Sequence, residues 1–485
     1  MVQVTAHDRS QIEISLDYCP SLSNVFYSDL YFFLPRNLGV HSNSYLREQF
    51  YSDLVNHLRF HTPIDSELLQ EEVVTLSKIL DANTTVQERE QLTPVAIQQV
   101  KLFASRVNTQ LKNFYASFSI DKLQKLYESI SIFRIKFIKP IQVSSLRVSL
   151  ELRQILLNCD EFVSNRLQAA CSELISGVSN KILSDILVQE KKYRKSLGSL
   201  FVDIGTSERE LEYFYFRHSL LKKQISQPLH IDKKSTKQER VYRNWVAGLG
   251  AALAGFWAQI ADYQAYKSHG YKDIGLSAIG IGCLAVFAYI FKDRIKDVSK
   301  EYISDKMKLF LPDYRSKLEF CEIEPEGKKV KKIIGNLSEC MRFSPVNQIP
   351  EDIFYIRKLK GRRDIGTENQ ETVIQYHKYV HFDEKVRVLG RAQNLCNIKD
   401  IHKFNFSYFL HHLDDAKKQL SIYDEDEGPS RISAPKVYHV NIVSHVRAKS
   451  VSTYNHFRVI LDKGGIVRIE TVLPTFNMEN GEVKL

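Results

Sequence analysis

The most continuous apolar pattern lies in the middle of the chain. Two charge-free runs, residues 245–261 and 274–291, are each 17 to 18 residues long, and Asp262 and Asp273 close their inner ends. As helices they would be about 26 Å long, which is at the short end for a bilayer core of about 30 Å. The pattern therefore predicts a transmembrane hairpin of two helices joined by a short polar loop.

Basic side chains crowd the outer ends of both runs, whereas the loop between them carries only Lys267 and Lys272. Because positive residues stay on the cytoplasmic side, we expect a membrane location, the inner membrane if the source is bacterial, with both termini in the cytoplasm. The expected partner of these flanks is a bilayer with anionic lipids. The residues predicted to contact it are Lys233, Lys234, Lys237, Arg240, Arg243, Lys292, Arg294 and Lys296.

Small residues recur at spacings of four within both runs. They are Ala247, Ala251 and Gly255 in the first run, and Ala278 and Gly282 in the second. Such positions let two helix backbones approach closely in lipid, so they predict packing of the hairpin. The same faces could join copies of the chain, and we therefore expect a homo-oligomer.

Two alternatives compete for these apolar runs. One is a buried helical hairpin inside a globular domain, although two adjacent charge-free runs are unusual for a core. The other is dinucleotide binding, because Gly280, Gly282 and Ala285 fit the G-x-G-x-x-A fingerprint. That fingerprint needs a strand, a turn and a helix, and here it lies within one apolar run, so the membrane interpretation is preferred.

Three short strings carry a resemblance. Residues 291–302 (FKDRIKDVSKEY), 32–35 (FFLP) and 457–470 (FRVILDKGGIVRIE) resemble an uncharacterised family of bacterial two-helix membrane proteins. The resemblance extends along most of the chain. It implies the two-helix topology and no particular activity, cofactor or site residue.

The segments on either side of the hairpin differ in pattern. Residues 12–16 alternate apolar and polar positions and predict a strand, so residues 1–41 are interpreted as a β-hairpin region. Apolar positions at Leu46, Phe50, Leu54 and Leu58 predict a helix, and longer helices are predicted over 95–138 and 145–197, with Asn158 and Gly177 as possible breaks. Residues 42–231 are thus predicted to be a helical cytoplasmic domain, a bundle or a coiled coil.

After the hairpin, strand patterns dominate, for example over residues 372–382 and 437–446. Gly464 and Gly465 between two alternating segments predict a tight β-turn. The predicted fold class is therefore an α+β membrane protein with a helical-rich cytoplasmic N-terminal region, a basic-flanked transmembrane hairpin within residues 232–300, and an α+β cytoplasmic domain over 301–485.

Composition adds three constraints. The 485 residues carry a formal net charge of +10, concentrated in the middle of the chain, which points to a membrane surface or nucleic acid as a partner. The seven cysteines show no metal-binding spacing, which favours a reducing compartment. Asp8, Glu13 and Asp17 interrupt the N-terminal segment, so no signal peptide is expected.

Two His/Asp clusters are the candidate metal ligands. His377 and His381, with Asp383, would share one face of a strand, and His411 and Asp415 would lie four apart on a helix. Both patterns also describe ordinary exposed polar faces, which is the competing interpretation. No catalytic residue and no cofactor is predicted.

Two segments imitate phosphate loops. Residues 203–206 (DIGT) resemble the first phosphate loop of actin-like ATPases, but Ser207 and Glu210 follow as a capping box, which indicates a simple helix start. Residues 361–367 (GRRDIGT) lack the lysine that would contact the β- and γ-phosphates.

The preferred hypothesis is a membrane-anchored, cytoplasm-facing scaffold, sensor or effector that self-associates. The alternative is a membrane-tethered, metal-dependent hydrolase or nuclease that uses the C-terminal His/Asp clusters. Ligand binding by the C-terminal strands is a third option, with the small-molecule ligand unknown, and nucleic acid is disfavoured as a partner.

Overall fold

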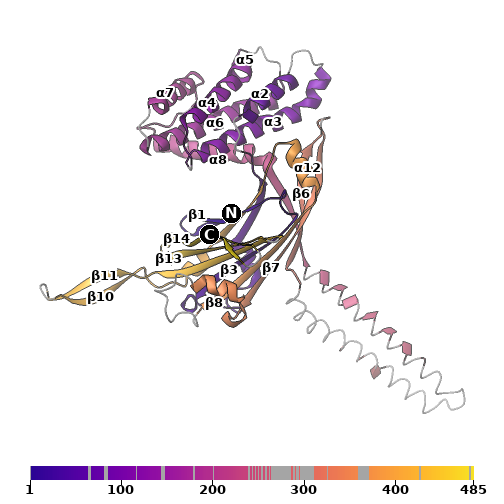
Figure 1. The fold of residues 1–485 in the computed structure, drawn as a ribbon, viewed down its shortest axis with the longest axis vertical. Coiled ribbons are helices and arrows are strands. Elements are labelled where there is room, and N and C mark those ends of the chain that lie inside the picture. Colours follow the sequence, from indigo (N-terminus) through magenta and orange to yellow (C-terminus); the bar gives the residue numbers. More distant parts are fainter. Residues whose placement is uncertain are drawn as a thin grey trace.

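Figure 1 shows the computed structural model of the chain. Helices gather above a large sheet in this view, and a narrow two-stranded ribbon projects to the left. The structure describes residues 2–63, 67–80, 86–115, 117–143, 148–177, 181–199, 201–238, 311–324, 326–358, 371–424, 428–449, 451–479 and 482–484, with scattered positions between 239 and 310.

Within this described part, thirteen strands form one antiparallel sheet in the order β1-β2-β9-β4-β5-β6-β7-β8-β3-β12-β13-β14-β15. Strands from the start of the chain therefore alternate with strands from its second half. Their bounds are β1 Val2–Ala6, β2 Gln11–Tyr18, β3 Val25–Pro35, β4 Leu54–Phe60, β5 His230–Lys237, β6 Tyr314–Ile323, β7 Lys329–Ser344, β8 Glu371–Phe382, β9 Ile398–Asn405, β12 Tyr438–Ala448, β13 Val451–Asp462, β14 Gly465–Glu479 and β15 Glu482–Lys484.

Alternation along the strands gives the sheet two distinct faces. One face, the core face, buries large apolar side chains such as Ile14, Phe32 and Phe404 in two neighbouring clusters. On the opposite face, the groove face, helix α11 (Glu351–Lys358) covers an apolar cluster that includes Phe33 and Val373. The same face also carries polar and aromatic side chains such as Arg315 and Tyr27.

The sheet curls until strands from its two ends meet. Residues of β1 and β14 are in contact, and the amide of Ile466 donates to the carbonyl of Arg9 at 2.8 Å. A Cβ at Gly465 would lie 2.3 Å from that same carbonyl oxygen, and Gly465 has a φ of +132°. Glycine is thus required at this contact by both its backbone conformation and the available space.

Helices from residues 67–226 pack around a separate apolar core that includes Leu69, Phe103, Ile130 and Leu156. Its longest members, α3 and α6, contact each other more than any other pair of helices in the described chain. The helices are α2 Glu67–Ile79, α3 Val86–Asn113, α4 Ile120–Phe133, the π-helical turn η2 Arg134–Ile138, α5 Lys139–Gln142, α6 Leu150–Gly177, α7 Lys181–Ser196 and α8 Glu208–Ser226.

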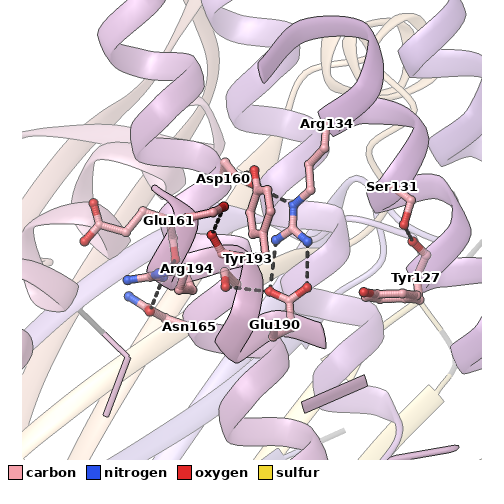
Figure 2. A network of polar contacts seen from close by, with 11 residues as sticks. Tyr127, Ser131, Arg134, Asp160, Glu161, Asn165, Glu190, Tyr193 and Arg194 are labelled. Atoms are coloured by element: carbon pink, nitrogen blue, oxygen red, sulfur yellow. Dashed lines mark hydrogen bonds and ion pairs between the residues drawn. The ribbon is translucent and has the colours of Figure 1, made fainter. Parts of the chain in front are cut away.

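A buried ionic network joins these helices, and Figure 2 shows it at close range. Arg134 donates to Asp160 Oδ1 at 2.7 Å and to Glu190 Oε1 at 2.6 Å, and its guanidinium also lies 4.0 Å from the ring centroid of Tyr193. Tyr193 and Ser164 donate their hydroxyls to the two carboxylates. The network therefore links η2, α6 and α7.

The smaller elements complete the fold. The 3₁₀ turns η1 (Arg36–Leu38), η3 (Gln227–Leu229) and η4 (Val346–Gln348) connect strands and helices, and so do the short helices α1 (Arg47–Asp53), α12 (Lys385–Ala392) and α13 (Ser407–Leu410). Strands β10 (Lys417–Asp424) and β11 (Gly428–Pro435) form the projecting ribbon of Figure 1.

The predicted membrane fold is wrong, and the predicted membrane location is wrong with it. No helix in the described part of the chain is long and apolar enough to cross a membrane. The α+β architecture instead buries its apolar side chains in the sheet and in the helical core. The structure describes about half of the first apolar run and only three residues of the second. The described positions are scattered helical residues, and Trp245 and Phe256 among them have exposed side chains.

Two local predictions also need correction. The helix predicted through Leu46, Phe50, Leu54 and Leu58 ends at Asp53, and the chain continues as strand β4 because β9 pairs with it over its whole length. The region over 95–138 and 145–197 does not form a coiled coil, since its helices end at 113, 133 and 177 and fold into a compact core.

Candidate functional site

The candidate site lies on the groove face of β6, β7, β8, β3 and β12. Strand β8 shows why the side chains point there. Its residues alternate, so Tyr376 and Lys378 are buried on the core face while His377 and Tyr379 lie on the groove face. The same alternation operates in each neighbouring strand and brings residues from remote segments into cross-strand rows.

The central row consists of the directly paired residues Arg447, Tyr27, Tyr379, Ser338 and Arg315. Tyr27 and Tyr379 have ring centroids 5.2 Å apart, and the guanidinium of Arg447 lies 5.2 Å from the Tyr27 ring. Tyr27 is 44% exposed, which is high for a tyrosine in the middle of a sheet. With strands spaced about 4.8 Å apart, the two arginines of the row are separated by about 19 Å.

A second, parallel row adds positive charge. Lys317 pairs across the sheet with Asn336 on one side and Lys234 on the other. Lys234 forms an ion pair with Glu319 at 2.8 Å. Arg315 and Lys317 are both exposed and form no ion pair with the described part of the chain. Arg315 and Lys317 therefore place two positive charges, without an ion-pair partner in the described chain, on the same face as the Tyr27–Tyr379 pair.

The row on the other side of the tyrosines is held by one buried carboxylate. Asp29 Oδ1 lies 2.8 Å from His377 Nδ1, and Asp29 Oδ2 accepts from Arg447 at 3.2 Å. His445 stacks on Tyr454 with ring centroids 4.1 Å apart, and burial lowers the pKa of this histidine below its ordinary value. Asp29 thus fixes Arg447 and His377 in position at the edge of the aromatic pair.

These rows line a groove of about 1070 Å³, whose rim includes Gln238, Pro312 and Arg342. Among its charged lining residues, lysine and arginine outnumber aspartate and glutamate. A groove of this size with converging cations and aromatic rings is suited to an anionic ligand that also carries a planar ring.

A polar network on the core face lies directly behind this site. Asp400 is fully buried and contacts three side chains: Lys378 donates to it, Tyr18 donates to Oδ2 at 2.9 Å, and His402 Nε2 lies 3.1 Å away. Burial lowers the pKa of Lys378 and of His402, whereas these two neighbours hold the pKa of Asp400 well below its usual range despite its burial. Because every member is enclosed, we interpret the network as an anchor for the sheet.

A second buried carboxylate continues this network. Glu339 on β7 accepts from Tyr376 and pairs with Lys233 of β5, and these two strands lie on either side of β6. The cations Lys233 and Lys378 keep the pKa of Glu339 below its ordinary value even though burial opposes this. The network therefore connects strands from both halves of the chain below the groove.

The predicted metal ligands do not meet. His377 and His381 share the groove face of β8 as expected, but His377 contacts Asp29 while His381 lies 3.8 Å from Asp383. His411 follows the end of the short helix α13, and Asp415 pairs with Lys463 at 2.7 Å. In the described residues no group of three or more His, Cys, Asp or Glu side chains is arranged to hold a metal ion.

The residues predicted to contact lipid are divided between strand β5 and the scattered positions after it. Lys233 lies on the core face with Glu339, while Lys237 pairs with Glu48 at 3.0 Å. Arg294 is an isolated helical position with an exposed side chain. Outside the described residues lie Arg240, Arg243, Lys292 and Lys296.

The predicted helix-packing residues are also only partly covered. Ala247, Ala251 and Gly255 have helical backbone, and neither Ala251 nor Gly255 is covered by another part of the described chain. Ala278 and Gly282 lie outside the described residues, as do Gly280, Ala285 and the loop over 361–367. The structure therefore leaves both packing and self-association as predictions.

The DIGT segment is a turn that directly precedes helix α8. Ser207 and Glu210 form the predicted capping box of α8, and Asp203 accepts from the amide of Ile204 at 2.9 Å. Asp203 also pairs with Lys191 at an exposed position. The capping prediction is confirmed.

Sequence reasoning missed Tyr27, Tyr379, Arg315 and Arg447. Each stands at an outward position of an alternating strand pattern, and that signal could have marked them as surface residues. Their assembly depends on the order β6-β7-β8-β3-β12, which joins segments more than 400 residues apart and leaves no local trace.

Comparison with known proteins gives no match, whether with protein-family models, with curated proteins or with solved structures. The functional argument therefore depends on the geometry of the groove face itself.

Proposed function

We propose that this protein is a binding protein, of the sensor or effector class, whose groove face takes a nucleotide unit. The observation that carries the proposal is the central row, in which Tyr27 and Tyr379 lie between Arg447 and Arg315. Aromatic rings on a sheet surface stack with bases, and flanking cations contact phosphates.

The length of the row favours more than one nucleotide. The backbones of Arg447 and Arg315 are about 19 Å apart along the sheet, across four strand spacings, so we expect different phosphates to contact the two arginines. A short single strand would place a base on the tyrosine pair and phosphates on the cations at either end. A free nucleotide shares this chemistry and would occupy only part of the groove.

The sequence pattern disfavours nucleic acid as a partner, whereas the geometry of the groove favours it. The groove draws its cations from β5, β6, β7 and β12, so no local run of sequence shows them together.

The test is fluorescence anisotropy with two probes, a labelled twelve-nucleotide oligothymidylate and a labelled ATP. Replacing Tyr27 with alanine should weaken oligonucleotide binding by about 5- to 150-fold, the range for one stacked base. Arg315→Gln should reduce the slope of log K against log salt by about 0.7. Lys331→Gln is the matched charge control, since Lys331 is an exposed lysine paired with Asp232 and does not line the groove.

The two probes separate the sources of the nucleotide. Tight binding of the oligonucleotide with weak competition by ATP identifies a single strand, whereas ATP binding of equal strength identifies a free nucleotide. Binding of neither probe would overturn the proposal. So would a loss of affinity in Lys331→Gln as large as that in Arg315→Gln.

A further inference from the structure

A second cavity, independent of the groove, lies between the helices and the sheet. It measures about 660 Å³ and is lined by α3, the start of α6, the end of α8, and strands β5, β6 and β7. Cavities between packed layers are common places for small-molecule sites, and this volume is within the usual range.

The cavity contains a buried cation that has no counter-ion among the residues that the structure describes. Lys101 on α3 is 8% exposed, and its ammonium donates to the amide oxygen of Gln227 at 2.9 Å. It forms no ion pair with any described residue, although Glu151 stands elsewhere on the cavity lining. A buried ammonium without a paired anion lowers the stability of the folded protein, and a bound anion would offset this cost.

Amide side chains line the same cavity as this cation. Gln98, Gln154, Gln224 and Gln227 all line the cavity. The side-chain oxygen of Gln224 accepts from Asn158 at 2.9 Å, which leaves its amide nitrogen as a donor toward a ligand. The lining also has apolar members, among them Ile97, Ile155 and Ile323. The cavity thus combines polar side chains with aliphatic surface.

From this arrangement we infer that the cavity binds a small organic carboxylic acid with an apolar body. The carboxylate would pair with Lys101 and accept from the neighbouring amides, and the apolar body would contact the isoleucines. The inference is separate from the nucleotide proposal because it concerns different residues and a different ligand. Burial lowers the pKa of Lys101, so the affinity should fall at alkaline pH as the ammonium loses its proton.

The experiment uses the full chain and isothermal titration calorimetry with sodium decanoate, sodium benzoate and the neutral 1-decanol. At least one acid should bind and the alcohol should not. Lys101→Met should weaken binding by about 10- to 150-fold, the range for a hydrogen bond to a charged group. Lys331→Met, at an exposed lysine that does not line the cavity, is the matched control and should bind normally.

A second variant and a second measurement distinguish a loss of binding from a folding defect in Lys101→Met. Ile323→Trp should block the acid by filling the cavity while it leaves Lys101 in place. In the unchanged protein, the bound acid should slow hydrogen exchange in α3 and β6 together, because both line the cavity. No binding of either acid would overturn the inference, and so would equal binding of 1-decanol or full affinity in a folded Lys101→Met variant.

Discussion

Removing Arg134 should destabilise the helical core more than any surface charge change. The Arg134→Ala variant leaves Asp160 and Glu190 without their shared cation, and their side chains are only 3% and 0% exposed. Breaking a buried ion pair by removal of one partner typically costs about 3 to 5 kcal/mol, because a charge is left buried and uncompensated. The loss of the contact with Tyr193 that Figure 2 shows adds to this cost.

The assay measures hydrogen exchange in peptides from α6 and α7 at increasing urea concentration. A local readout is needed because a chain of this size need not unfold in one step. The control is Arg217→Ala, which removes a pair with Glu161 whose partners are 30% and 23% exposed. That pair should contribute at most about 1 kcal/mol. A cost below about 1 kcal/mol for Arg134→Ala, or equal costs for the two variants, would refute the reasoning.

Three further predictions concern the sheet. Burial lowers the pKa of His445 in the folded protein below the ordinary histidine value of about 6.5. Near that pH the unfolded chain therefore binds more protons than the folded chain, so the free energy of unfolding should fall as the pH drops below neutrality. The thermal midpoint of His445→Phe should fall less over the same pH range. Lys378→Met should lower the free energy of unfolding by about 3 kcal/mol, as measured by urea denaturation, because it leaves Asp400 buried without its ammonium. Gly335→Ala should cost more than about 2 kcal/mol in the same assay, since its Cβ would lie 2.3 Å from the carbonyl oxygen of His381. An unchanged urea midpoint in Lys378→Met or in Gly335→Ala would contradict the predicted role of the Lys378–Asp400 pair or of the close approach at Gly335.

Local signals in the sequence predicted local structure well. The paired glycines at 464 and 465 correctly marked the turn between β13 and β14, and the alternation over residues 12–16 correctly marked β2. Gly177 ends α6 as one of the two predicted breaks. Each of these features is decided by a few neighbouring residues, so one segment of sequence contains the information.

The spacing over Leu54 and Leu58 shows where local signals fail. Positions four apart share a face in a helix and also in a strand, and here the pairing with β9 decides for the strand. The transmembrane prediction failed for a related reason. Length and lack of charge describe only the composition of a segment, and they carry no information about the rest of the fold.

The candidate site could not be predicted because it is made entirely by pairing. Strand β8 has β7 on one side and β3 on the other, and β3 is more than 300 residues earlier in the chain. The inward Lys378 is fixed by Asp400 of β9, while its neighbours His377 and Tyr379 point outward into the groove. The anchor thereby fixes the strand that carries His377 and Tyr379 on the opposite face. Under the proposed function, a strand held in this way would reduce the entropy that a ligand must overcome on binding.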